Sequence, residues 1–265
     1  MQHWSIFHFS FYYLFYCFCI YSFLGWTLET IYATVKKGHF VNRGFLKGTF
    51  CPIYGFGALS LIVFLYPVYN NLILLFMCSV ILTTLIEYFT GYILEKCFNS
   101  VWWDYSDVPF NLKGRICLSF SLFWGIISIF IIKIIHPIVA KLISIIPLNA
   151  GIPLLYCLTF YFITDFATTI IEIVQIKYIL KELDILSKQI KDKVAYIKEN
   201  AAEKTLQRTE NIEEKIEDLK SKYEALTNRI MNEYSRLIKA FPNITSKKFN
   251  HILNEIKEKI SFKKN

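Results

Sequence analysis

Long apolar stretches separated by short polar loops occupy the first two thirds of the chain. A membrane-spanning helix needs roughly 20 apolar residues, and more if it is tilted. Five stretches reach or approach that length: residues 9–33, 50–67, 70–93, 116–135 and 152–176. The second is the shortest, and Pro52, Gly55 and Gly57 interrupt its beginning. Residues 138–148 are apolar but too short to cross, so we expect them to form a separate interfacial piece.

The last third has a different pattern. Neither Gly nor Pro occurs from Leu154 to Phe241, so the fifth span is expected to leave the membrane as an unbroken helix. Apolar residues then recur in steps of three and four, in two blocks around a polar interval near 198–211: Ile179, Leu183, Leu186, Ile190, then Ile212, Ile216, Leu219, Tyr223, Leu226, Ile230. This spacing is typical of a coiled coil. An interval that turns gives an antiparallel hairpin; one that does not gives a rod that dimerises.

Pro242 ends that helical region, and a short basic amphipathic segment follows. Its apolar stripe is Phe249, Ile252, Leu253, Ile256 and Ile260, flanked by lysines. Such a stripe suits an anionic membrane surface, or it packs back on the hairpin. The chain is therefore predicted to be all-α: a polytopic membrane helix bundle over 1–177, a coiled coil or helical hairpin over 178–241, and the basic helix over 242–265.

The charge distribution predicts the orientation of the bundle. The chain is 54% hydrophobic, and the first 28 residues hold no Asp, Glu, Lys or Arg, so we expect an uncleaved first span. Basic residues gather in the first loop (Lys36, Lys37, Arg43, Lys47) and the third (Lys96, Lys113, Arg115), with none in the second. The positive-inside rule then places the N-terminus outside the plasma membrane and the tail in the cytoplasm. Nucleic acid is not an expected partner, since the tail helices mix both charge signs.

Motifs for catalysis are absent from the sequence. The chain has no Gly-rich loop ending in Lys-Ser or Lys-Thr, no Gly-x-Ser-x-Gly elbow and no histidine-based metal motif. Its seven cysteines have no regular spacing and mostly fall in apolar runs, where they suit packing better than a metal or a disulfide. We therefore predict no catalytic residue, no cofactor and no metal, and a chain that is not an enzyme.

Four acidic residues lie within apolar runs that are otherwise almost uncharged: Glu29, Glu87, Asp165 and Glu172. A carboxylate in hydrocarbon costs on the order of several kcal/mol, so these side chains are expected to face protein or an aqueous cavity. Asp165 and Glu172 are two helical turns apart and share a helix face, and Glu87, Gly91 and Glu95 mark a similar face. The acids either line a substrate or ion pathway or lock helices together through ion pairs and hydrogen bonds.

The loop before the fourth span combines aromatic and charged residues. It contains Trp102, Trp103, Asp104 and Tyr105, followed by Asn111 and Arg115. Such a loop is either an interfacial anchor or a gate or partner-docking loop, to which Arg43 of the first loop would contribute.

Several segments together resemble the CmpB-like family of type IV ABC-transporter permeases. They are Gly25-Trp26-Thr27-Leu28-Glu29, Asn42-Arg43-Gly44-Phe45-Leu46, Cys51-Pro52-Ile53-Tyr54-Gly55, Glu87-Tyr88-Phe89-Thr90-Gly91, Trp102-Trp103-Asp104-Tyr105-Ser106, and Asn111–Leu118 leading to Trp124-Gly125. The resemblance covers about residues 20–130 and implies a bacterial integral membrane protein of the ABC-permease kind.

These observations favour the membrane component of a transporter with an unknown substrate. We expect it to work in the lipid bilayer with a separate ATPase subunit, and to form a homo-oligomer if the coiled coil pairs two chains. The alternative is a non-transporting scaffold or sensor that recruits partners through its tail. A third hypothesis, a lipid-modifying enzyme, would place catalysis in the Trp102–Arg115 loop.

Overall fold

The computed structural model describes residues 5–6, 9–199 and 206–262 and is mostly helical. The chain divides into two compact units. The first comprises the residues up to Cys97 and Val101–Thr169; the second comprises Phe98–Ser100 and the chain from Ile170 onward. One long helix, α6, contributes to both.

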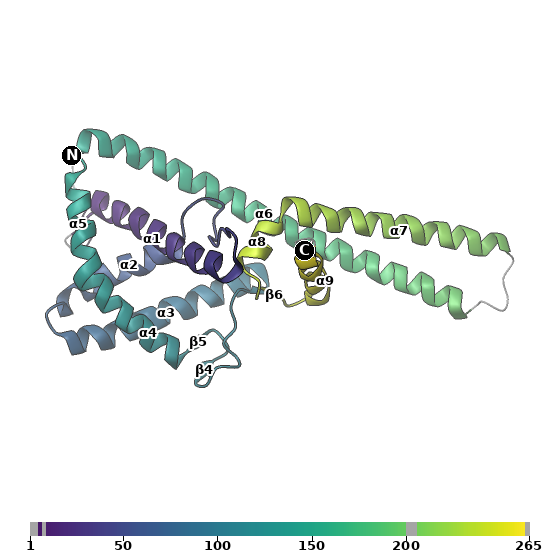
Figure 1. The fold of residues 1–265 in the computed structure, drawn as a ribbon, viewed down its shortest axis with the longest axis horizontal. Helices are drawn as coiled ribbons and strands as arrows, with labels where there is room; N and C mark the ends of the chain where they lie inside the picture. The colour runs from purple at the N-terminus through teal and green to yellow at the C-terminus, as the bar shows by residue number, and fades with distance from the viewer. Residues whose placement is uncertain (1–4, 7–8, 200–205, 263–265) are drawn as a thin grey trace. The chain divides into compact units, whose positions relative to one another are not determined.

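The first unit is a set of helices joined by short loops (Figure 1). The helices are α1 (Phe11–Lys37), α2 (Pro52–Leu65), the 3-10 helix η1 (Tyr66–Val68), α3 (Leu72–Phe98), α4 (Leu118–Phe130), the π-helix η2 (Ile131–Ile135), α5 (His136–Ile145) and the start of α6 (Leu148–Glu199). Two antiparallel strand pairs complete it: β1 (Ser5–Ile6) with β2 (Phe9–Ser10), and β4 (Asn111–Leu112) with β5 (Ile116–Cys117).

Four helical segments are long and apolar enough to cross a membrane: Phe11–Lys37, Leu72–Phe98, Leu118–Ile145 and Leu148–Lys198. The predicted second span is shorter, because α2 has 14 residues and only η1 extends it. It runs antiparallel to α1: Tyr54, at its start, lies against Gly25, and Tyr66, past its end, meets the ring of Phe9. The number of spans and their orientation stay predictions.

The helix of the predicted fourth span, 116–135, is longer than expected and includes residues 138–145. An interfacial position for residues 138–148 stays a prediction. α4, η2 and α5 follow one another without a break, so one helical run extends to Ile145. In the π-turn, the backbone N–H of His136 donates to Ile131, five residues back. Pro137 then falls in the first turn of α5, where its missing N–H matters little. The wider π-turn thus lets the helix continue past Pro137, a residue type that usually ends or kinks a helix.

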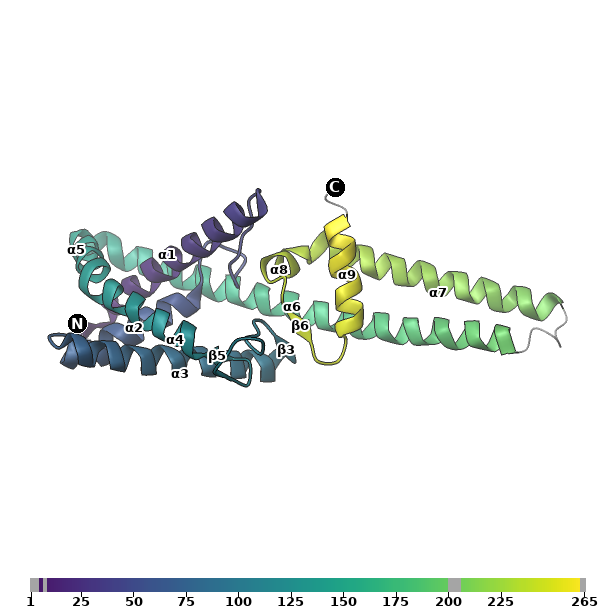
Figure 2. The same ribbon diagram turned by 60° about the horizontal axis from the view of Figure 1, so that its bottom comes forward.

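The unbroken fifth helix is confirmed, since α6 runs for 52 residues. Within the second unit, α7 (Leu206–Glu233) returns antiparallel beside α6 (Figures 1 and 2). Ile179 and Leu183 of α6 share a core with Ile230, near the end of α7. Of the two predicted arrangements, the structure therefore has the hairpin. The predicted turning interval lies partly outside the described residues.

The remaining elements of the second unit are β3 (Ser100–Val101, which straddles the boundary), α8 (Ser235–Ala240), β6 (Thr245–Ser246) and α9 (Asn250–Phe262). The apolar stripe of α9 is buried: Ile252 and Ile256 are each 1% exposed and join the same core as Leu183. α9 therefore packs on the hairpin, and this stripe is not free to enter a lipid surface.

Candidate functional site

The connection between α1 and α2, residues 38–51, lies along α1 as irregular backbone. Thr34 Oγ1 accepts a hydrogen bond from the N–H of Val41, and the Ser22 carbonyl accepts one from the N–H of Cys51. Between them, Trp26 Nε1 donates to Asn42 Oδ1 over 2.8 Å. From Thr34 to Ser22 is about 18 Å of helix at 1.5 Å per residue. The connection therefore follows the last turns of a membrane-length helix.

Glu29 is held between this connection and α2. Its Oε1 accepts a hydrogen bond from the Tyr54 hydroxyl at 2.5 Å, and its Oε2 lies 3.3 Å from Arg43 Nε. Gly25 makes the first contact possible, because a Cβ there would lie 2.2 Å from the Tyr54 ring. The Arg43 and Glu29 side chains are 32% and 30% exposed, so the protein does not enclose the pair completely.

Asp165 of α6 holds the same connection from another direction. Its Oδ1 and Oδ2 accept hydrogen bonds from the backbone N–H groups of Lys47 and Gly48, each at 2.9 Å. Two N–H donors stabilise an ionised carboxylate. Gly48 is required here, since a Cβ would lie 1.6 Å from the Tyr161 hydroxyl. Asp165 is 8% exposed.

The predicted face of α3 binds the loop that joins α3 to α4. Tyr105 donates to Glu87 Oε1 at 3.1 Å, and Arg115 donates to Glu95 Oε2 at 2.6 and 2.9 Å. Between these two contacts, the Trp103 ring lies over Gly91, 3.1 Å from where a Cβ would be. Positions spaced by four residues on one helix face thus clamp the loop at three points.

The polar residues inside that loop set its shape. Asp104 Oδ1 accepts hydrogen bonds from the N–H and hydroxyl of Ser106, and the Asn111 side chain bonds Ser106 O, Val108 O and the N–H of Gly114. Gly114 has φ +67°, and Asp104 fills the space that a Cβ would need. Trp102 is 6% exposed and packs on Phe45. Asp104, Asn111 and Trp102 are thus engaged within the protein.

Tyr105 brings two of the predicted acids to one place. Its pKa is raised by burial and then by the negative charges of Glu87 and Glu29, both within electrostatic range of the phenol. Asp165 instead contacts residues 47 and 48. Glu172 contacts Arg236 of α8 in the second unit at 3.3 Å and is 3% exposed. Tyr105 thus contacts Glu87 and lies within electrostatic range of Glu29, whereas Glu29 itself contacts Tyr54 and Arg43. The shared pathway for all four acids stays a prediction.

Several partners were missed by the sequence reasoning. Tyr54 belongs to the Cys51–Gly55 segment that carries the family resemblance. Its position in the sequence, however, does not indicate a contact with Glu29. Arg236 lies in the tail, 64 residues from Glu172, with no pattern to connect them. Within the described residues, no group of three or more His, Cys, Asp and Glu could hold a metal ion.

Membrane-length helices whose polar side chains secure two irregular connections define an integral membrane protein. The family model described as "Putative ABC-transporter type IV" matches residues 16–170, and the chain belongs to that family. The match includes the contacts of Glu29, Glu87 and Asp165, whereas α7, α8 and α9 lie beyond it. No curated protein and no solved structure matches the chain.

Proposed function

We propose that the protein is the multi-pass membrane component, or permease, of an ABC-type transporter that works with a separate ATPase subunit. The observation that carries this proposal is the connection 38–51, tied to α1 on one side and to Asp165 of α6 on the other. Irregular backbone at membrane depth is tolerated only where it is buried in protein or lines a watery cavity. Transporters place their binding sites at such interruptions of membrane helices.

The partly exposed Arg43–Glu29 pair is the part of this region that we expect a substrate to meet. In the proposed site, water enters beside this partly exposed pair. Water and salt weaken an exposed ion pair, so an incoming charged group could displace either partner. Hydrogen bonds to α1 and α6 hold the connection in place, and two of them go to Asp165. Its movement would open or close access to Glu29 and Tyr54. In this mechanism Asp165 positions the gate, and Glu29 and Arg43 meet the substrate.

The same proposal places the basic third loop and the helical tail in the cytoplasm, where an ATPase subunit would dock. The first loop would fold back into the bundle from that side. The α3–α4 loop suits this role because three contacts to α3 make it rigid. A rigid loop transmits movement of the partner to the helices, whereas a loose loop would absorb it.

Inside-out membrane vesicles test the proposal directly. Vesicles from cells with and without the gene are compared for ATP-dependent changes in their contents, by untargeted profiling of small molecules and lipids, and the purified protein is tested for an accompanying ATP-hydrolysing subunit. We expect an ATP-dependent difference that Asp165→Asn reduces and the control Lys141→Gln, at an exposed position on α5, does not. Identical contents with and without the gene, together with no such subunit, would overturn the permease function.

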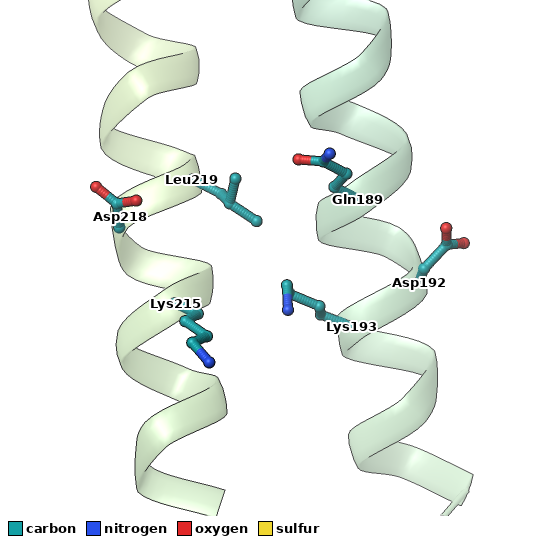
Figure 3. Close-up of a pocket in the computed structure, with 6 residues that line it drawn as sticks. All are labelled: Gln189, Asp192, Lys193, Lys215, Asp218 and Leu219. Atoms are coloured by element: carbon teal, nitrogen blue, oxygen red, sulfur yellow. The ribbon is translucent and has the colours of Figure 1, made fainter.

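One observation in the second unit favours the scaffold or sensor instead. Between α6 and α7 lies an open gap lined by Gln189, Asp192, Lys193, Lys215, Asp218 and Leu219 (Figure 3). Lys193 and Lys215 extend into it from the two helices, and like charges facing one another attract an acidic partner. If the tail is a recruiting surface, charge reversal of both lysines removes copurifying partners, while Lys191→Glu with Lys220→Glu, on exposed positions outside the gap, does not.

A further inference from the structure

The acidic residues of the membrane-length helices differ in what neutralises them. Glu29 lies beside Arg43, Glu95 beside Arg115 and Glu172 beside Arg236. Asp165 has no arginine but accepts two backbone N–H groups. Each of these carboxylates therefore has a cation or a pair of donors that stabilises its negative charge.

Glu87 is the exception among the acidic residues within the apolar stretches of these helices, which are Glu29, Glu87, Glu95, Asp165 and Glu172. Glu87 accepts one hydrogen bond, from the hydroxyl of Tyr105 to Oε1, and has no cationic partner in the described part of the chain. Its Oε2 is buried and has no hydrogen-bond partner among the described residues. The hydroxyl of Thr84, about one turn earlier on α3, is buried in the same way. Two buried oxygen atoms on one helix face thus retain unused hydrogen-bonding capacity.

The charged and titratable neighbours of Glu87 give no compensation. From the α3–α4 loop, Tyr105 faces it, and Arg115 is already occupied by Glu95 and by the hydroxyl of Tyr88. Glu29 of α1 acts on the same Tyr105 and adds negative charge. α4 packs on α3 through Gly125 and contains no Asp, Glu, Lys or Arg. The neighbouring arginines are thus already paired with other acids, Arg115 with Glu95 and Arg43 with Glu29, and neither neutralises Glu87.

We propose that Glu87 is a proton-binding site: its carboxylate takes up a proton at Oε2 and releases it when water enters this part of the bundle. On binding, an O–H bond of a hydronium ion breaks and the O–H bond at Oε2 forms, which leaves a water molecule; release reverses both changes. Protonation removes an uncompensated buried charge, and it turns Oε2 into a donor for an acceptor such as Thr84. This inference deepens the proposed function, on which its biological role rests, by naming the proton as an ion that the permease binds.

Infrared spectroscopy of the full-length protein in lipid vesicles tests the inference without a transport assay. The carbonyl stretch of a protonated carboxyl group is separate from that of a carboxylate, and it is followed while the pH is raised. We expect a protonated-carboxyl band that disappears on alkaline titration and is lost in Glu87→Gln. The matched control Glu29→Gln keeps the band. If wild type and Glu87→Gln give the same titration difference, Glu87 is not the proton site and the inference fails.

A second variant should shift the pH at which the protonated-carboxyl band disappears, without removing the band. The Tyr105 hydroxyl stabilises the ionised form of Glu87, so Tyr105→Phe is expected to move loss of the band to higher pH. An unchanged or lower titration midpoint contradicts this geometry. Protonation can be found in a protein that shows no ATP-dependent transport, and transport can be found without protonation, so the two proposals fail separately.

Discussion

The Asp165 carboxylate and the backbone N–H of Gly48 are joined by a 2.9 Å hydrogen bond across 117 residues of sequence. This contact connects α6 to the irregular connection that precedes α2. Side chains in membrane bundles more often meet other helices, so an acid that holds loop backbone indicates that the loop is part of the packed structure.

Replacing Asp165 by Asn tests the strength of that attachment. An amide has one acceptor oxygen, so one of the two N–H groups loses its acceptor and meets an NH2 group. Loss of a buried hydrogen bond costs about 1–3 kcal/mol, and we expect a comparable loss of stability. Limited proteolysis in detergent should cut residues 38–51 faster in Asp165→Asn than in Asp107→Asn. Equal cutting rates would show that the carboxylate does not hold the connection.

Gly48→Ala should destabilise the first unit, because the added methyl group meets the Tyr161 hydroxyl. Overpacking of this kind typically costs about 1–3 kcal/mol. Tyr161→Phe removes the obstructing oxygen atom, so the double variant should recover part of the loss. Thermal unfolding of wild type, the two single variants and the double variant gives the coupling free energy between the two positions. Additive effects would mean that the two residues do not meet.

Arg115→Met should loosen the α3–α4 loop. Arg115 and Glu95 are 14% and 15% exposed, and the guanidinium also lies 5.3 Å from the Tyr88 and Tyr92 ring centroids. Removing one partner of a buried pair leaves a charge without compensation and costs roughly 3–5 kcal/mol. Arg115→Lys keeps the charge but loses the paired hydrogen bonds to Glu95 and the stacking on the tyrosine rings. Its loss of stability should therefore lie between zero and that of Arg115→Met. Hydrogen exchange of residues 102–115 should rise in the order wild type, Lys, Met.

Acid should weaken the attachment of α9 to α7. Burial alone would raise the pKa of Glu255, but hydrogen bonds from Lys259 and Tyr223 outweigh it and leave the pKa below its ordinary value. A carboxyl group with a lower pKa in the folded state stabilises that state above its unfolded pKa, and this contribution disappears as the pH falls through the folded pKa. Thermal unfolding of the full chain followed by a probe on α9 should show less acid sensitivity in Glu255→Gln. A matched exposed control is Glu258→Gln.

Much of the fold could be predicted from the helical periodicity of the sequence. The absence of Gly and Pro predicted the unbroken α6, and the spacing of Glu87, Gly91 and Glu95 marked a face that the α3–α4 loop covers. The continuation of the fourth helix to Ile145 was missed because apolar length and proline positions do not reveal a π-turn. Its cost and benefit depend on what packs around it, here the contacts of α5 with α1.

The sequence by itself determined that this chain is helical, apolar enough to enter a membrane, and provided with acids that need partners. Those properties follow from local composition and from a repeat of 3.6 residues. Only the tertiary structure decided which partner each acid has: Tyr54 and Arg43 for Glu29, backbone N–H groups for Asp165, and Arg236 for Glu172. Such pairs depend on distances set by packing of the whole chain, and many arginines and tyrosines would satisfy the same local pattern.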